Sequence, residues 1–202
     1  MRCRFCHNPH LVFDPGSQPE ISEDEILDFL RRRRGRLEGV VISGGEPTVH
    51  KDLPEFVKRV VEAGFSVKLD TNGSNSEMVL RLVYAHLVDA LGIDYKHLFS
   101  KYPLATGIKS EEIIEGVKYT FSCLPHLSIP YDVRTTVHKA IHSPSDLIAM
   151  RNELDDLGIV NWTIQPFNDV EVIDESLGKL ETYSEIELAD IVTGLHDTSI
   201  RG

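Results

Sequence analysis

Apolar positions along the chain alternate between helical and strand spacing, and this alternation begins near residue 22. Ser22 followed by Glu25 has the spacing of a capping box, in which the two side chains satisfy free backbone amides at a helix start. The apolar positions that follow recur at helical spacing, and Gly35 ends the segment. The next apolar run, over 39–43, is bounded by glycines and is typical of a buried strand. The pattern therefore predicts a helix over 22–35 and a strand over 39–43.

The same alternation continues to the end of the chain. Amphipathic segments predict helices over 52–63, 76–86, 111–123, 144–157 and 185–195. The apolar runs between them predict strands over 65–69, 88–93, 131–137 and 160–165. Five strands that alternate with helices imply an α/β fold with a parallel sheet and right-handed crossovers. Residues 1–20 contain three prolines and are expected to form a loop. Spacing alone does not distinguish a doubly wound sheet from a full or partial barrel.

Polar motifs follow the predicted strands directly. In parallel α/β folds the carboxyl ends of the strands share one edge, where active sites form. Asp, Asn and Gly are also common in turns, so a single motif of this kind is more often structural. Five of them at successive strand ends favour a binding site over unrelated loop caps. The motifs are Gly44-Gly45-Glu46-Pro47, Asp70-Thr71-Asn72-Gly73, Asp94-Tyr95-Lys96, Arg134-Thr135-Thr136 and Gln165.

Composition and charge narrow the class of protein. The 202 residues are 41% hydrophobic and 26% charged, ordinary values for one globular domain with a real core. Lys plus Arg is 21 and Asp plus Glu is 32, so the net charge of −11 argues against a non-specific nucleic-acid binder. No apolar run has membrane-spanning length, and the N-terminus lacks a signal-peptide stretch. A basic run at the end of the first predicted helix, from Arg31 to Arg36, is expected to be a solvated face.

The sequence has three cysteines, too few for a secreted disulfide framework, so a reducing cytoplasm is expected. Cys3-Arg4-Phe5-Cys6 is a Cys-x-x-Cys pair. Such a pair can be a redox dithiol, half of a zinc site or part of an iron–sulfur ligand set. Cys123 falls within a predicted helix and is expected to be a buried core thiol.

With these motifs in place, the sequence resembles the radical S-adenosylmethionine (SAM) superfamily from Cys3 to about Gln165. Cys3, Phe5 and Cys6 match the second half of the family's cluster motif, Cys-x3-Cys-x2-Cys with an aromatic residue before the last cysteine. Gly44-Gly45-Glu46-Pro47 matches the family motif that holds the methionyl amino group of SAM. The stretches Cys-His-Asn-Pro, Asp-Thr-Asn-Gly and Asp-x-Lys resemble the glycyl-radical-enzyme activases. Val-Ile-Ser-Gly-Gly-Glu-Pro-Thr, Lys-Leu-Asp-Thr-Asn-Gly-Ser-Asn and Arg-Thr-Thr-Val resemble anaerobic ribonucleoside-triphosphate reductase activating proteins in particular.

The resemblance implies a partial parallel (β/α) barrel of the radical SAM type that lacks its first strand. It implies a single domain over 1–202, with a remnant of the cluster loop over 1–20 and a C-terminal cover over 168–202. The first cysteine of the motif would lie two residues upstream of Met1, and the family's first strand would precede it. We therefore expect an N-terminally truncated chain, whose two thiolates alone hold no full [4Fe–4S] cluster.

The resemblance also implies which residues hold the cofactors. Cys3 and Cys6 would bind the [4Fe–4S] cluster, whose open iron takes the amino and carboxylate groups of SAM. Glu46 would accept a charge-assisted hydrogen bond from the SAM ammonium, and Gly44 and Gly45 would let the backbone approach closely. The remaining cofactor residues would be Lys96 and Arg134 toward the carboxylate, Asp70 and Asn72 toward ammonium or ribose, Phe5 beside adenine, and Asp94 and Gln165 on the rim.

The activity implied is reductive cleavage of SAM to generate a glycyl radical on an anaerobic ribonucleoside-triphosphate reductase. An electron donor such as flavodoxin or ferredoxin would be a second partner, and neither nucleic acid nor membrane is expected as one. Two alternatives stay open: a radical SAM enzyme that acts on a small molecule, and a cluster-free SAM-binding remnant, which the missing cysteine favours. A zinc module built on the cysteine pair is disfavoured by the strand-end motifs.

Overall fold

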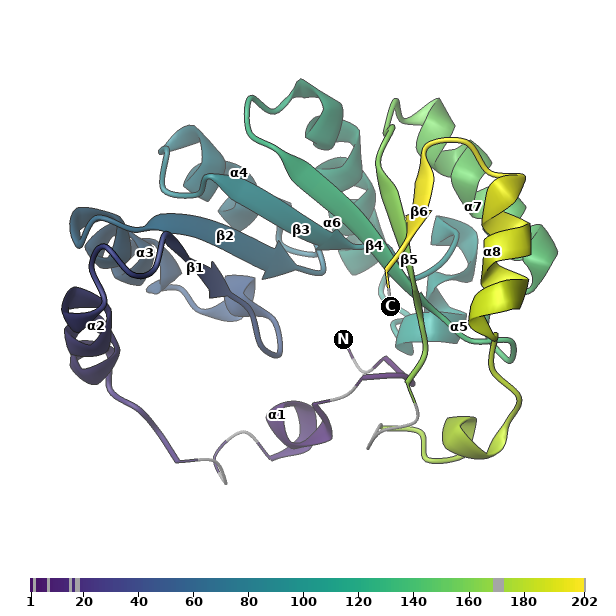
Figure 1. The fold of residues 1–202 in the computed structure, drawn as a ribbon, viewed down its shortest axis with the longest axis horizontal. Coiled ribbons are helices and arrows are strands. Elements are labelled where there is room, and N and C mark those ends of the chain that lie inside the picture. Colours follow the sequence, from purple (N-terminus) through teal and green to yellow (C-terminus); the bar gives the residue numbers. More distant parts are fainter. Residues whose placement is uncertain (2, 7, 15, 17–18, 169–172, 202) are drawn as a thin grey trace.

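Six parallel strands form one sheet in which the spatial order follows the chain order, in a computed structural model that describes residues 1, 3–6, 8–14, 16, 19–168 and 173–201 (Figure 1). Each strand pairs in parallel with the next one along the chain. The strands are β1 (Gly39–Ile42), β2 (Ser66–Thr71), β3 (Ala90–Asp94), β4 (Tyr131–Val137), β5 (Trp162–Pro166) and β6 (Thr198–Ile200). Parallel pairing places the carboxyl ends of all six at one edge of the sheet.

The sheet is curved, and helices cover its convex side (Figure 1). The N-terminal segment lies across the concave side instead. Among the described strands, β1 and β6 each pair with one neighbour, so the barrel is not closed. The strand order follows the chain without the reversal that defines a doubly wound sheet, so that alternative is excluded. The helices are α1 (Pro9–Phe13), α2 (Glu23–Arg32), α3 (Leu53–Glu62), α4 (Ser76–Tyr84), α5 (Tyr102–Thr106), α6 (Glu111–Cys123), α7 (Pro144–Asp156) and α8 (Glu185–Thr193). Short 3-10 turns are η2 (Pro47–Val49), η3 (Phe99–Lys101), η4 (Leu124–His126) and η5 (Leu177–Lys179).

The predicted elements are present, and the structure adds three that the periodicity did not predict. The predicted capping box of Ser22 and Glu25 begins α2 as expected. The sheet has six strands rather than five, because β6 is three residues long and too short for a period to emerge. Helices α1 and α5 are five residues each and both begin beside a proline, which is tolerated in a first helical turn. Helix α1 lies inside the segment that was expected to be entirely loop.

The main hydrophobic core lies between the convex face of the sheet and the helices. Leu69, Ile93 and Val133 come from three adjacent strands and are fully buried there together with Trp162. Cys123 was expected in this core, but it is only half-buried. It is the last residue of α6, where the chain leaves the helix for η4 near the surface.

A second, smaller cluster fixes the N-terminal segment on the concave side. Cys3 and Phe5 are buried there against Ala105, Ile141 and Phe167, with Leu177 completing the cluster. The backbone amide of Arg4 also donates to the carbonyl of Ala105, with 3.2 Å between N and O. The cysteine pair is therefore held by apolar packing and backbone pairing rather than left as a free tail.

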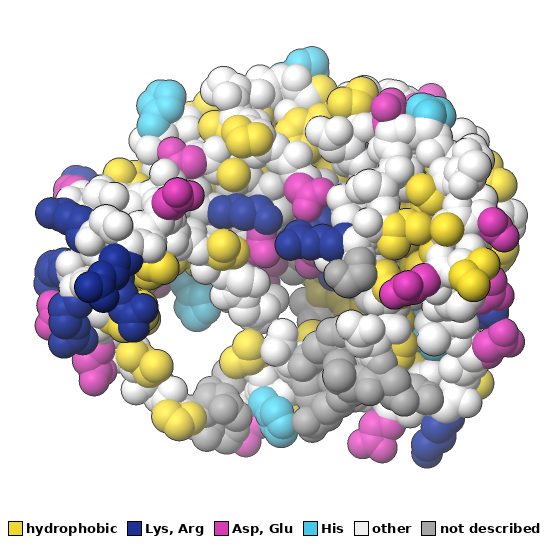
Figure 2. All heavy atoms as spheres, in the orientation of Figure 1, with side chains coloured by type: hydrophobic (Ala, Val, Ile, Leu, Met, Phe, Trp, Pro, Cys, Tyr) yellow, Lys and Arg dark blue, Asp and Glu magenta, His cyan; other side chains and the backbone are white. Residues whose placement is uncertain are grey.

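The basic run at the end of α2 is exposed, as the sequence predicts. Figure 2 shows Lys and Arg side chains gathered at the end of the molecule where α2 lies. Arg31, Arg32, Arg33 and Arg36 are all exposed, and Arg34 is tied to the carbonyl of Ala63 by its guanidinium. In the described part of the chain, no helix combines the length and the apolar character needed to span a bilayer.

Candidate functional site

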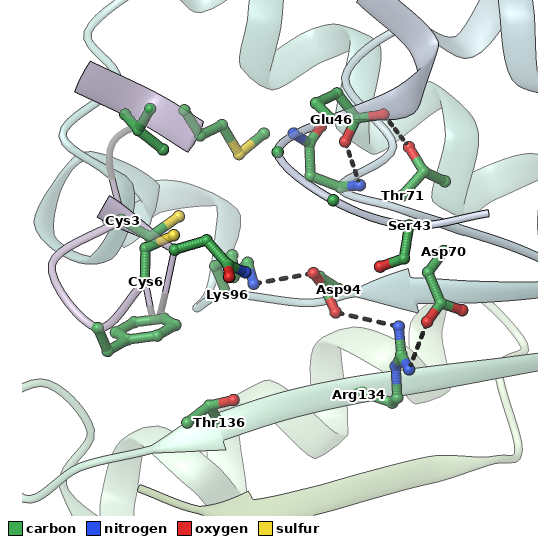
Figure 3. Close-up of a pocket in the computed structure, with 17 residues that line it drawn as sticks. Cys3, Cys6, Ser43, Glu46, Asp70, Thr71, Asp94, Lys96, Arg134 and Thr136 are labelled. Carbon is green, nitrogen blue, oxygen red and sulfur yellow. Dashed lines mark hydrogen bonds and ion pairs between the residues drawn. The ribbon is translucent and has the colours of Figure 1, made fainter. Parts of the chain in front are cut away.

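A cavity of about 230 Å³ lies at the carboxyl ends of β1 to β4, closed on one side by the N-terminal segment (Figure 3). Apart from Gln165, every residue predicted from the sequence to hold metal or cofactor lines this cavity. Those residues are Cys3, Phe5, Cys6, Gly44, Gly45, Glu46, Asp70, Asn72, Asp94, Lys96 and Arg134. The structure thus brings together side chains that are up to 131 positions apart in the sequence, from Cys3 to Arg134.

Gln165 does not line the cavity. It is half-buried on β5, in register with Thr136 of β4, which does line the cavity. The strand-end rule placed Gln165 at the correct edge of the sheet, but the cavity ends one strand earlier. Its contact with a cofactor stays a prediction.

The loop after β1 presents backbone and one carboxylate to the cavity. Gly44 has a φ of +137°, a backbone conformation that favours glycine, and so the chain can turn sharply at the strand end. Glu46 follows as the N-cap of η2, where its side chain accepts from the backbone amide of Thr48. The sequence Gly44-Gly45-Glu46-Pro47 therefore folds so that a carboxylate is fixed at the rim of the sheet.

The Glu46 carboxylate is held by four donors from two loops. Its Oε1 accepts from the amide of Thr48 at 3.1 Å, the hydroxyl of Thr48 at 2.5 Å and the hydroxyl of Thr71 at 2.6 Å. Its Oε2 accepts from the amide of Asn72 at 2.7 Å. All four donors are uncharged, so the negative charge of Glu46 is solvated but not neutralised.

Charged side chains form a ladder across β2, β3 and β4 on the floor of the cavity. Arg134 lies between two carboxylates, with Nη1 at 3.1 Å from Asp70 Oδ2 and Nη2 at 3.5 Å from Asp94 Oδ1. Lys96 Nζ lies 3.0 Å from the other oxygen of Asp94. Lys68 Nζ lies 3.3 Å from Asp70 Oδ1, an ion pair that lacks hydrogen-bond geometry. Each carboxylate of this ladder is thereby next to two cations.

The ladder depends on a missing side chain in the central strand. A Cβ on Gly92 of β3 would lie 2.2 Å from Asp70 Oδ1 and 2.8 Å from Arg134 Nη2. Both distances are well inside van der Waals contact, so only glycine leaves room for Arg134 to reach Asp70 across β3. The buried Nε of Arg134 has no hydrogen-bond partner among the described residues.

Lys96 connects the ladder to the cysteine pair. Its Nζ lies 5.5 Å from the centre of the Phe5 ring, within range of a cation–π interaction. Burial alone would lower the pKa of Lys96, but the negative charge of Asp94 outweighs it, with help from Cys3, and the pKa is raised. Burial raises the pKa of the Cys3 thiol, and the positive charge of Lys96 opposes this in part.

The cysteine pair satisfies two thirds of the expected cluster ligand set. Cys3 and Cys6 line the cavity side by side, and their sulfur atoms are drawn close together in Figure 3. Cys123, the third cysteine of the sequence, lies at the end of α6 and does not line the cavity. Within the described residues, no group of three or more His, Cys, Asp or Glu side chains is placed to hold a metal ion. The described residues therefore supply two of the three thiolates that such a cluster needs.

The segment after β5 covers the cysteine loop, in the region expected to be a C-terminal cover. The guanidinium Nε of Arg4 lies 2.8 Å from Asp174 Oδ2. The amide of Ile173 donates to the carbonyl of Cys6 at 3.2 Å, and the amide of Asp174 donates to the carbonyl of Arg4 at 3.0 Å. Residues 169–172 of this predicted cover lie outside the described residues.

Three fully buried histidines join the loops below the cavity, and their burial was not predicted from the sequence: His97, His138 and His142. Each accepts from a backbone amide at Nδ1 and bonds a distant backbone carbonyl at Nε2, which assigns the neutral Nε2–H tautomer. Burial lowers the pKa of all three, for His142 to about 4. No role was predicted for four hydroxyl-bearing residues, because serine and threonine at strand ends carry no distinctive signal. Three of them line the cavity, namely Ser43, Thr71 and Thr136, and the fourth, Thr48, bonds Glu46.

Comparison with known proteins identifies the family of this arrangement. Residues 1–130 match the sequence model described as the Radical SAM superfamily. A Methanocaldococcus jannaschii protein described as a candidate glycyl-radical enzyme activating enzyme is 30% identical over 197 residues, which cover 95% of this chain and 78% of that protein. A Thermococcus kodakarensis protein described as a probable GTP 3′,8-cyclase is 29% identical over 143 residues, 70% of this chain and 45% of that protein.

A solved structure has the same fold. A domain of the pyruvate-formate lyase-activating enzyme from Bacteroides vulgatus matches with a TM-score of 0.61 and 20% identity. The match covers 81% of this chain and 99% of that domain. The chain and that domain therefore share the arrangement of strands and helices.

Proposed function

Because the chain belongs to the radical SAM superfamily, we propose that it is a glycyl-radical-enzyme activase that acts on an anaerobic ribonucleoside-triphosphate reductase. Members of this superfamily use a [4Fe–4S] cluster and SAM. A cluster bound at Cys3 and Cys6 would supply the one-electron reduction of SAM that starts hydrogen abstraction from the substrate. In an activase, that hydrogen comes from a glycine of the partner protein.

One observation carries the proposal of an activase. The identity to the Methanocaldococcus jannaschii protein extends over 95% of the chain, whereas the identity to the cyclase extends over 70% of it. The motifs at the ends of β1, β2 and β4 support the reductase as the partner, because they resemble the activating proteins of that enzyme. Flavodoxin or ferredoxin would supply the electron.

The proposed SAM site follows from the charges of the cavity. Glu46 offers a fixed carboxylate that no Lys or Arg among the described residues pairs with, which suits the ammonium of SAM. Lys96 and Arg134 line the cavity and would meet the SAM carboxylate, although both already pair with Asp94. Phe5 presents its ring near the cysteine pair, and Asp70 and Asn72 lie where ribose or ammonium would reach them.

The proposed cluster site needs a third thiolate. Cys3 and Cys6 would supply two, and the third is expected two residues upstream of Met1. We predict that the 202-residue chain, reconstituted anaerobically with iron and sulfide, binds substoichiometric iron. Close to four irons per chain with a brown charge-transfer band would contradict this prediction.

The test of the activase uses a form of the protein extended upstream of Met1 to include that cysteine. The extended protein is reconstituted anaerobically, reduced and incubated with SAM and the reductase. We expect an electron paramagnetic resonance doublet from a glycyl radical on the reductase, with 5′-deoxyadenosine formed in matching amount. A reductase whose radical-bearing glycine is replaced by alanine, and a Cys3→Ala activase, should both give no doublet.

The outcomes separate the proposed function from its alternatives. Cleavage of SAM without a radical on the reductase would reject the reductase as substrate and favour an enzyme acting on a small molecule. An extended protein that binds SAM but assembles no cluster would favour the cluster-free remnant.

A further inference from the structure

The loop that follows β1 and the last residue of β2 both donate hydrogen bonds to one carboxylate oxygen of Glu46. Oε1 of Glu46 accepts three hydrogen bonds, two from Thr48 and one from the hydroxyl of Thr71. Oε2 accepts one, from the amide of Asn72. A carboxylate has about four lone-pair sites, two on each oxygen, so Oε1 is saturated by its three donors, while Oε2 keeps a site that no described residue fills.

Both threonines are buried at this junction. Thr48 is 1% exposed and Thr71 is 2% exposed. The carbonyl of Thr48 accepts from the side-chain amide of Asn75 at 2.7 Å, and Asn75 is also the N-cap of α4. Thr71 Oγ1 accepts in turn from the amide of Gly73 at 3.1 Å. The hydroxyl of Thr71 is thus fixed from both sides and the backbone of Thr48 is held by Asn75, which leaves Glu46 little freedom to rotate.

We propose that Thr48 and Thr71 are positioning residues that hold Glu46 so that the free site of Oε2 receives the ammonium of SAM. The inference rests on the proposed use of SAM at this site. Rotation of the carboxylate would break three hydrogen bonds of Oε1. The clamp formed on Glu46 by Thr48, Thr71 and Asn72 therefore fixes the direction of the remaining acceptor site. The threonines act through Glu46, because Thr48 does not line the cavity and the hydroxyl of Thr71, which does, is already bonded to Glu46 and to the amide of Gly73.

A purely structural role for the two threonines makes a different prediction. If the clamp serves only to join two loops, its loss lowers stability and weakens every ligand of the cavity alike. If the clamp orients the Glu46 carboxylate, loss of the clamp removes the preference of the cavity for ligands that carry an ammonium group. The ligand's ammonium is therefore the feature to vary.

The experiment measures equilibrium binding of SAM and of its deaminated 2-oxo analogue to the 202-residue chain by anaerobic equilibrium dialysis. The unmodified chain should bind SAM at least tenfold more tightly than the analogue, since a charge-assisted hydrogen bond is lost in the analogue. Thr71→Val and Thr48→Val should each reduce this ratio by about three- to tenfold. Thr71→Ser keeps the hydroxyl and should restore the ratio.

A double-mutant cycle tests whether the threonines act through Glu46. In a Glu46→Gln background, adding Thr71→Val should change SAM affinity by less than about twofold, because residues that share one interaction are not additive. Thr135→Val is the matched control. Thr135 is also 1% exposed and makes two hydrogen bonds on β4, but it does not line the cavity. It should lower the thermal midpoint without changing the ratio.

Several results would overturn the inference. An unchanged ratio in both valine variants would do so, as would additive losses in the cycle or undetectable SAM binding by the unmodified chain. Failure of the proposed activase function would look different. A chain that binds SAM through this clamp but raises no glycyl radical leaves the positioning role intact and rejects the reductase as substrate.

Discussion

Glu46 at the end of β1 and Asp94 at the end of β3 both present a carboxylate to the same cavity, but their surroundings differ. Glu46 is held by uncharged donors, namely two backbone amides and two threonine hydroxyls. Asp94 is held by charges, with Lys96 Nζ at 3.0 Å and Arg134 Nη2 at 3.5 Å. One half of the cavity is thus a clamp in which uncharged donors of Thr48, Thr71 and Asn72 hold the Glu46 carboxylate. The other half is the charged ladder.

This difference determines how much negative charge each carboxylate still presents to a ligand in the cavity. Neutral donors stabilise a carboxylate without cancelling its charge, so Glu46 still attracts a cation in the cavity. In the ladder, the two aspartates face Lys68, Lys96 and Arg134, and the charges largely compensate one another. We therefore expect changes at Glu46 to act mainly on recognition of the SAM ammonium, whereas changes in the ladder should lower stability in addition to removing a contact with SAM.

The largest effect is expected for Arg134→Met. Removing the guanidinium leaves Asp70 and Asp94 close together with one cation each. Breaking a fully buried pair costs roughly 3–5 kcal/mol, and because Asp94 is 34% exposed we expect a loss of about 2–3 kcal/mol. Urea unfolding monitored by circular dichroism measures this loss.

The matched control is Lys118→Met, which removes an exposed pair with Glu115 on α6. Exposed pairs contribute about 0–1 kcal/mol, so its unfolding free energy should hardly change. Equal losses in the two variants would mean that the ladder is no more than a set of surface ion pairs.

The second prediction concerns the clamp. Glu46→Gln keeps the shape of the side chain and removes its charge. A hydrogen bond to a charged group contributes about 1.5–3 kcal/mol, so SAM should bind roughly tenfold more weakly or worse. Titration calorimetry on the extended, cluster-loaded protein measures the dissociation constant.

Glu38 provides the control for this variant. It is exposed and precedes β1, at the opposite end of the strand from Glu46. Glu38→Gln should leave the dissociation constant unchanged. If Glu46→Gln also left it unchanged, Glu46 would be a structural turn residue and a different cationic ligand would have to be sought.

The sequence predicted the position of the Glu46 carboxylate better than the ion pairs of the ladder. Glu46 follows a buried strand in a motif of glycine and proline, and that local pattern places a carboxylate at a strand end. The ladder depends on which residues face one another across three strands, and on the absence of a side chain at Gly92. Register across strands is a tertiary property, so the spacing along the chain predicted the rim but not its ion pairs.

The same limit explains what was missed around the cavity. The three buried histidines come from two loops and bond carbonyls far away in sequence, such as His138 to Leu177. Strand β6 and helix α1 are too short for a repeating period. Gln165 follows the strand-end pattern, yet the residues that line the cavity end with Thr136 on β4.

The third prediction uses pH to destabilise the loops beneath the ladder before the loop that carries Glu46. The three histidines support the loops after β3 and β4, beneath the ladder, and are neutral in the fold. His142 has its pKa lowered by burial to about 4, against about 6.5 unfolded, so its contribution to stability is present above pH 6.5 and is lost as the pH falls toward 4.

Between pH 7 and pH 5, His142 alone should cost about 2 kcal/mol of unfolding free energy. Hydrogen exchange should then rise first in the loops over 95–99 and 138–142, and later in the loop over 44–49, where Glu46 is clamped. A His142→Gln variant should lose most of this pH dependence. Equal rises in both halves at pH 5 would show that the histidines do not support the ladder selectively.

The smallest effect is expected for Lys68→Met, at the outer end of the ladder. Lys68 is 31% exposed and its Nζ lies 3.3 Å from Asp70 Oδ1 without forming a hydrogen bond, while Arg134 still compensates Asp70 after the change. We expect a loss below about 1 kcal/mol in urea unfolding, which shrinks further in high salt because exposed charges are screened. Arg134→Met should respond less to salt, since its guanidinium is 14% exposed. A loss in Lys68→Met as large as that in Arg134→Met would mean that Asp70 depends on Lys68. The ladder would then be two separate pairs, with Arg134 serving Asp94 alone.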